Sequence, residues 1–176
     1  PRPGVSVDGP TAEAAATFYA ETFPDSRVTA VYRSPTDHPN GKGVNAKHIR
    51  AAVEESLRRL GTDYIDLYYL HKEDHATPLG ETVRAIGDLV AQGKIRHFGV
   101  SNYRSWRVAE ICRICDELGI DRPVVSQPYY NAMNRMPEVE HLPACGYYGL
   151  GVASYSPLAR GVLTGKYTPG ATPEQG

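Results

Sequence analysis

Polar and aromatic side chains stand at or just beyond the ends of several apolar segments. They are His71, Ser101, Asn102, Gln127 and Tyr155. A histidine can donate a hydrogen bond to a carbonyl oxygen, and an Asn, Gln and Ser set can satisfy both the donor and the acceptor end of a carboxamide. A tyrosine ring can stack on another planar ring. These residue types indicate a polar site where such segments end, with a buried, backbone-bonded histidine as the alternative for His71.

The segments that position these residues read as short strands. His71 follows the almost unbroken apolar run of residues 63–72, DYIDLYYLHK, and similar runs cover residues 95–102 (IRHFGVSN), 123–131 (PVVSQPYYN) and 150–161 (LGVASYSPLARG). Helical stretches separate them, one of which is expected over residues 46–60. This alternation is typical of right-handed βα units and a parallel sheet. Because the carboxyl ends of parallel strands share one edge, the polar residues should converge there.

Four ordered motifs in the same region resemble the aldo-keto reductases: SLRRLGTDYIDLYYLH, GKIRHFGVSN, SQPYYN and YSPLARGVLTGKY. The resemblance covers residues 36–176. It implies an NAD(P)H-dependent oxidoreductase that reduces an aldehyde or ketone, on a (β/α)8 barrel. The fold class expected is therefore α/β, with a partial TIM barrel of about four βα units, preceded by a short βαβ segment.

The resemblance also implies a role for each matching residue. His71 looks like the catalytic histidine that orients and polarises the substrate carbonyl. Ser101, Asn102 and Gln127 look like the residues that hold the nicotinamide carboxamide, and Tyr155 looks like the aromatic that stacks on the nicotinamide ring. The residues that resemble the loop under the cofactor pyrophosphate are Ser156, Pro157, Leu158 and Arg160. For Ser101 and Asn102 an alternative is a cap for a helix that begins near residue 105.

Other family features are not found in these 176 residues. Reduction needs a proton for the developing alkoxide, which the family takes from a tyrosine tuned by a lysine and an aspartate. The segments that carry them resemble DTAxxYG and ATK, and neither pattern occurs here. We expect NADP(H) or NAD(H) binding to be weakened and turnover to be impaired. A fusion, a designed chimera or a truncated chain would each account for this pattern.

Residues 1–35 are expected to have a different origin from residues 36–176. They read as strand, helix and strand, and they resemble the opening of a vicinal oxygen chelate domain of the 3-demethylubiquinone methyltransferase-like branch. They contain no histidine and no carboxylates at persuasive ligand spacing, so no metal site is expected. A non-catalytic binding or assembly module is the alternative function.

The composition of the chain limits which classes of binding partner are expected. The formal net charge is −1 and hydrophobic residues make up 41%, which gives no reason to expect nucleic acid or a membrane surface as a partner. The chain has 3 cysteines, and the CxxC pair Cys112 and Cys115 lies in an amphipathic stretch, where packing is the usual role. We expect a cytoplasmic protein that binds a nicotinamide cofactor and a small carbonyl substrate. A partial barrel leaves open sheet edges, through which a homodimer could form.

Overall fold

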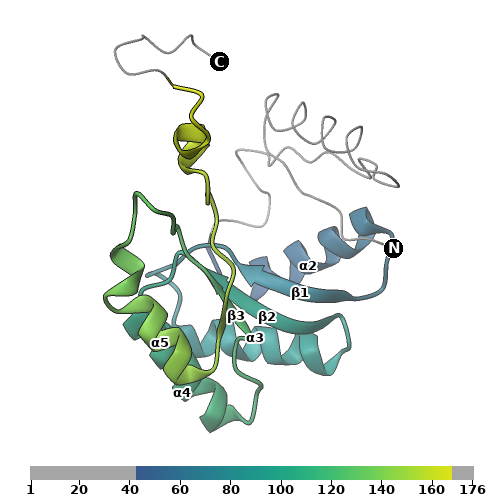
Figure 1. The fold of residues 1–176 in the computed structure, drawn as a ribbon. Coiled ribbons are helices and arrows are strands. Elements are labelled where there is room, and N and C mark those ends of the chain that lie inside the picture. The colour runs from purple at the N-terminus through teal and green to yellow at the C-terminus, as the bar shows by residue number, and fades with distance from the viewer. Residues whose placement is uncertain (1–42, 168–176) are drawn as a thin grey trace. The chain divides into compact units, whose positions relative to one another are not determined.

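The computed structural model describes residues 43–167 as parallel strands that alternate with helices (Figure 1). The strands are β1 (Ile65–Leu70), β2 (Ile95–Ser101), β3 (Val125–Gln127) and β4 (Gly151–Val152). The α-helices are α2 (Ala46–Leu60), α3 (Leu79–Ala91), α4 (Ser105–Leu118) and α5 (His141–Tyr148), and the 3-10 helices are η1 (Met136–Glu138) and η2 (Ala159–Thr164). Within the described part, no helix is long and apolar enough to cross a membrane. The βαβ segment predicted for residues 1–35 lies outside the described residues.

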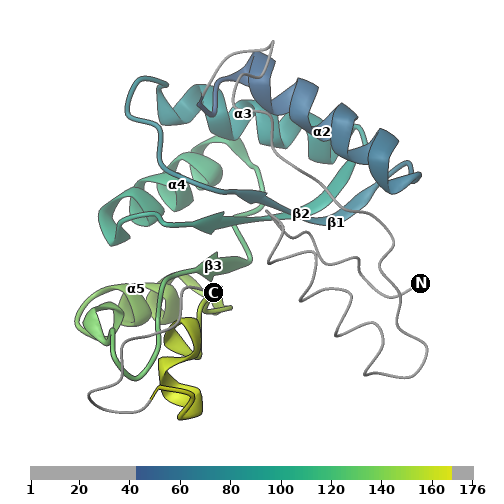
Figure 2. The same cartoon turned by 90° about the horizontal axis from the view of Figure 1, so that it is seen from above.

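The four strands form one parallel sheet in the order β1-β2-β3-β4. Successive helices pack on one another, α2 against α3, α3 against α4, and α4 against α5. Figure 2 shows α2, α3 and α4 side by side over the same face of the sheet. Strand order that follows chain order, with helices wound in the same sequence, is the arrangement of a (β/α)8 barrel. The predicted α/β class is confirmed, and the sheet is consistent with part of such a barrel.

Helix α2 spans the residues that its sequence pattern predicts. Its start is capped by Asn45, whose side chain accepts a hydrogen bond from the backbone nitrogen of His48 at 2.9 Å. Its C-cap is Gly61, which adopts a left-handed conformation with φ 65°. Ile49, Val53 and Leu57 recur at every fourth position and are all buried. The amphipathic pattern therefore fixes which face of α2 packs on α3.

The two faces of the sheet differ in how far they are covered. Leu70 pairs with Val100 in the register of β1 and β2, and both are buried beneath the helices, at 2% and 0% exposure. Leu67 pairs with His97, and the side chains of both residues are exposed. Side chains alternate between faces along a strand, so the second face is the one that would line the inside of a barrel.

Strands β3 and β4 are shorter than the apolar runs suggest. Pro123 and Pro128 flank β3, and proline has no backbone N–H to donate to a neighbouring strand. β4 has only the two residues Gly151 and Val152, and a single bridge between Tyr129 and Tyr155 prolongs the pairing beyond it. The sheet nonetheless holds its register up to Ser101, which pairs with Gln127 at the carboxyl edge.

Candidate functional site

The carboxyl edge of the sheet brings the predicted site residues together. Ser101 ends β2 and Gln127 ends β3, while His71 directly follows β1. Tyr155 reaches the same edge through its bridge to Tyr129, the second residue after β3. Parallel pairing puts all of these positions at one end of the strands, which agrees with the predicted convergence.

Hydrogen bonds tie three neighbouring strand ends to one another. The buried Ser101 hydroxyl donates to the backbone oxygen of Gln127 at 2.9 Å. The Asn102 side-chain nitrogen donates to the backbone oxygen of His71 at 3.1 Å and to Ser101 Oγ at 3.0 Å. These bonds fix the relative positions of the three strand ends, which is what a preorganised site requires.

Asn102 is held in an unusual backbone conformation. Its φ is 57°, in the left-handed region that asparagine tolerates better than most residues other than glycine. Its backbone nitrogen still donates to the Gln127 oxygen, at 3.4 Å. α4 begins at Ser105, as predicted, but the residue at its N-cap is Arg104, and no side chain caps the helix. The capping alternative for Ser101 and Asn102 is therefore wrong, because neither residue caps α4.

The side chains of His71 and Gln127 have no hydrogen-bonding partner among residues 43–167. Neither the imidazole of His71 nor the amide of Gln127 makes a hydrogen bond to another residue in the range 43–167. His71 is exposed and Gln127 is half-buried. Both groups can therefore hydrogen-bond a ligand without breaking an interaction within this part of the chain.

Tyr155 is fixed at the edge by contacts on two sides. Its backbone nitrogen donates to the Pro128 oxygen at 3.0 Å, and its ring lies 5.3 Å from that of Tyr129, at an interplanar angle of 33°. Its hydroxyl donates to Asn102 Oδ1 at 2.8 Å. The ring is half-buried. This aromatic side chain is thus held beside the polar residues that could bind an amide.

The loop after Tyr155 turns sharply. Ser156, Ala159 and Arg160 have φ of 54°, 48° and 56°, so all three lie in the left-handed region. The side-chain nitrogen of Asn131 donates to the Ser156 oxygen at 3.0 Å and anchors the start of this loop. Pro157, Leu158 and Arg160 are exposed. Asn131, the last residue of the SQPYYN motif, is therefore a positioning residue whose role the motif alone does not reveal.

A charged cluster that the sequence did not predict joins the loop after β1 to the start of α4. The Glu73 side chain, only 8% exposed, accepts a hydrogen bond from the backbone nitrogen of Arg104 at 2.6 Å. The buried guanidinium of Arg107 contacts His75 Nδ1 at 3.1 Å and donates to the Asp74 oxygen at 2.9 Å. A guanidinium can only donate, so His75 Nδ1 must accept. The cluster braces the loop that begins at His71.

Hydrogen bonding and burial shift the pKa of groups around this edge. The Thr77 hydroxyl is the largest cause that holds the pKa of Asp74 below its usual value, and the backbone nitrogens of Ala76 and Val44 add to the effect. Burial lowers the pKa of His141, whose Nε2 lies 2.8 Å from Ser126 Oγ. The charged form of Asp74 is therefore favoured, and so is the neutral form of His141.

The three cysteines pack in the hydrophobic core. Cys112, Cys115 and Cys145 are free and buried, and burial raises the pKa of the Cys115 thiol to about 12. This outcome agrees with the predicted packing role for the CxxC pair, because a buried thiol with a raised pKa is a poor nucleophile and a poor metal ligand. Among residues 43–167, no group of His, Cys, Asp and Glu side chains could hold a metal ion.

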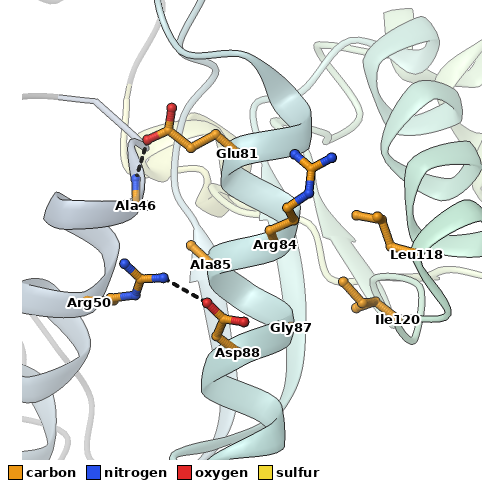
Figure 3. Close-up of a pocket in the computed structure, with 9 residues that line it drawn as sticks. All are labelled: Ala46, Arg50, Glu81, Arg84, Ala85, Gly87, Asp88, Leu118 and Ile120. Carbon is orange, nitrogen blue, oxygen red and sulfur yellow. Dashed lines mark hydrogen bonds and ion pairs between the residues drawn. The ribbon is translucent and has the colours of Figure 1, made fainter.

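Several hollows lie on the described surface, and two of them differ in their position relative to the predicted site. Figure 3 shows the first, a groove of about 540 Å³ between α2, α3 and the end of α4, where Arg50 pairs with Asp88 at 2.7 Å and Glu81 accepts from the Ala46 nitrogen. This groove is lined by helix residues and by Ile120, and none of the predicted site residues lines it. The second, of about 380 Å³, lies beside Asn102 and Tyr129. Of the predicted site residues, only Asn102 lines it.

Comparison with known proteins identifies relatives of this chain. The model of the Aldo/keto reductase family matches residues 8–176. Aflatoxin B1 aldehyde reductase member 2 of Mus musculus is 48% identical over 127 residues, which is 72% of this chain and 35% of that protein. The human protein of the same name is 45% identical over 144 residues, covering 81% and 39%. A probable voltage-gated potassium channel subunit beta of Oryza sativa subsp. japonica is 42% identical over 136 residues, covering 77% and 42%.

The match begins earlier than the sequence motifs suggest. The motifs cover residues 36–176, whereas the family model starts at residue 8, inside the segment for which we predict a separate origin. The vicinal oxygen chelate resemblance is not shown, and the separate origin of residues 1–35 stays a prediction. The chain spans less than half the length of the relatives named above. With a family model matched over nearly its whole length, on a parallel α/β sheet, this chain belongs to the aldo/keto reductase family.

Proposed function

We propose that this chain provides a nicotinamide-binding edge of an NAD(P)H-dependent reductase that acts on an aldehyde or ketone. The observation that carries the proposal is the hydrogen-bonded convergence of His71, Asn102, Gln127 and Tyr155 at the carboxyl edge of the sheet. Reductases named for an aldehyde substrate are among the relatives of the chain. The family resemblance suggests the cofactor, and the types of the residues at the edge suit it.

The chemistry of the edge fits a nicotinamide in three respects. The half-buried amide of Gln127 has a donor and an acceptor that no residue in the range 43–167 uses, which suits a carboxamide. The ring of Tyr155 could stack on the nicotinamide. The exposed guanidinium of Arg160 could pair with a phosphate, next to Ser156, Pro157 and Leu158. When bound, the cofactor supplies the hydride, and the protein supplies its orientation.

His71 would act on the substrate. Its exposed imidazole makes no hydrogen bond within residues 43–167, so a ring N–H could donate to a substrate carbonyl oxygen and draw electron density from the carbon that accepts hydride. Because the segments resembling DTAxxYG and ATK do not occur in these 176 residues, the proton donor of the family is not supplied by a matching motif. General acid catalysis contributes about 100- to 10,000-fold, so we propose that this chain by itself turns over far more slowly than a complete reductase.

Cofactor titration tests the proposal. The full chain is titrated with NADPH and with NADH by calorimetry, beside Gln127→Ala and the control Gln92→Ala, which removes an exposed amide at the far end of α3. We expect saturable binding that Gln127→Ala weakens by about tenfold, the effect of one or two lost hydrogen bonds, and that Gln92→Ala leaves unchanged. No heat at millimolar cofactor, from a chain shown to be folded by circular dichroism, would refute cofactor binding.

A binding or assembly module is the second candidate function. Two observations favour it: one relative is a probable potassium channel subunit rather than a named reductase, and Leu67 is 37% exposed on the open face of the sheet. A homodimer through this face or the free sheet edge belongs to this candidate. Such a module needs no cofactor, so the same titration separates the two functions.

A further inference from the structure

The amide of Asn102 has little hydrogen-bonding capacity left for a ligand. A side-chain amide has two N–H donors, and those of Asn102 are directed to the His71 oxygen and to Ser101 Oγ. The Ser101 hydroxyl already donates its hydrogen bond to the Gln127 backbone oxygen. The accessible group through which Asn102 could still bind a carboxamide is therefore its own carbonyl oxygen, Oδ1, which can accept an N–H.

One of the two lone pairs of that oxygen already accepts a hydrogen bond, from the hydroxyl of Tyr155. This hydroxyl donates to Asn102 Oδ1 at 2.8 Å, across 53 positions of sequence, from the chain beyond β4 to the end of β2. The position of the ring is restrained, because the Tyr155 backbone nitrogen donates a hydrogen bond to the Pro128 oxygen and the ring contacts that of Tyr129. Two donors on one carbonyl oxygen share its electron density, so a second donor meets a weaker acceptor.

We propose that the Tyr155 hydroxyl competes with the carboxamide of the nicotinamide for Asn102 Oδ1, and that cofactor binding weakens the contact between Tyr155 and Asn102. This inference rests on the proposed cofactor binding and deepens it. The two parts of one side chain act in opposite directions: the ring of Tyr155 provides a stacking surface, whereas its hydroxyl acts as an intramolecular latch on the amide site.

Removal of the hydroxyl alone should therefore strengthen binding. Tyr155→Phe keeps the ring, its contact with Tyr129 and the backbone bond to Pro128. Asn102 is exposed, so water can solvate Oδ1 in the variant, and no buried polar atom is left without a partner. The net value of one neutral hydrogen bond corresponds to a change in the dissociation constant of about three- to tenfold.

The experiment is a thermodynamic cycle on the full chain. Dissociation constants for NADPH are measured by calorimetry for the wild type, Tyr155→Phe, Asn102→Gly and the double variant. Glycine is chosen at position 102 because it adopts φ near 57° without strain. Tyr147→Phe is the matched control, since Tyr147 is 83% exposed at the end of α5. It lies shortly before β4 begins, and thus toward the amino ends of the parallel strands. Circular dichroism checks that each variant is folded.

We expect Tyr155→Phe to bind NADPH about three- to tenfold more tightly than the wild type, with Tyr147→Phe unchanged. In the Asn102→Gly background the effect of Tyr155→Phe should vanish. If the wild type binds and Tyr155→Phe binds equally or more weakly, the latch is refuted while the proposed function stands. Tightening that persists without Asn102 would also refute it. If no folded variant binds, the proposed function fails and the latch fails with it.

Discussion

Replacement of Gly99 by alanine tests the packing of the sheet directly beneath the site. Gly99 lies in β2, two residues before Ser101, and pairs with Tyr69 on one side and Val125 on the other. A Cβ at this position would lie 2.7 Å from Val125 Cγ1, 2.8 Å from Tyr69 Cε1 and 3.0 Å from the Val125 backbone oxygen. Carbon atoms in ordinary contact are about 3.5–4.0 Å apart. The ring or the neighbouring strand would have to move.

The expected cost follows from two opposing effects. Overpacking of a well-packed position costs about 1–3 kcal/mol. Alanine also loses less backbone entropy than glycine on folding, which offsets about 0.5–1 kcal/mol. The neighbours of Gly99 are a short valine side chain, an aromatic ring and a backbone oxygen, none of which can swing aside cheaply. We therefore expect Gly99→Ala to lower the free energy of unfolding by about 1–2 kcal/mol.

Urea denaturation followed by circular dichroism measures the change. The matched control is Gly146→Ala, because Gly146 lies inside α5 and a Cβ there would meet nothing within 4 Å. It should raise the free energy of unfolding by about 0.5–1 kcal/mol, since alanine is the better helix former. A Gly99→Ala variant as stable as the wild type, in the same experiment in which Gly146→Ala is stabilising, would refute the register of β1, β2 and β3 described here.

Three further predictions concern titration and association. Burial raises the pKa of Cys115 to about 12 and that of Cys112 above 9.0, so both thiols should resist alkylation at pH 8 in the folded chain and react promptly in urea; rapid labelling of the folded chain would contradict their burial. Because their folded pKa values are raised, the stability that these neutral thiols contribute is complete below the unfolded value of 9.0 and is lost as the pH rises through the folded values. The pKa of Asp74 is lowered, so its pH dependence is opposite: its contribution to stability is present above pH 3.8 and is lost as the pH falls through the folded pKa. The difference in unfolding free energy between wild type and Asp74→Asn should therefore shrink in acid. A difference that stays constant from pH 7 to pH 2 would count against this. If the open sheet face associates, sedimentation velocity should show a dimer that Leu67→Glu converts to a monomer, whereas a wild-type monomer at all concentrations would exclude that interface.

Much of the fold could be predicted because the sequence repeats one unit. Apolar runs that end in polar residues, separated by amphipathic stretches, predicted the parallel strands, and the bounds expected for the helix over residues 46–60 are confirmed. The extent of β3 and β4 was harder to predict. Pro128 ends β3 at Gln127 because it lacks a donor, a local effect that the apolar composition of the run conceals.

The details of the site depend on contacts between residues far apart in the chain. The left-handed conformation of Asn102 and the bond between Tyr155 and Asn102 follow from how two loops meet, which sequence spacing does not encode. The burial of Arg107 has the same origin, because a residue that reads as a solvated helix cation is covered by the loop of Asp74 and His75. The sequence pattern predicted which residues lie at the edge, whereas the internal hydrogen bonds of the edge required the structure.

A titration of the ¹⁵N-labelled full chain with NADPH, followed by the backbone and side-chain amide signals, tests cofactor binding at the strand ends directly. We expect saturable shifts for Asn102, Gln127 and Tyr155 at the carboxyl edge, with the amides in the middle of α3 unchanged. Shifts confined to the helical groove around Arg50 and Arg84, or the absence of any shift at millimolar cofactor, would contradict a nicotinamide site at the strand ends.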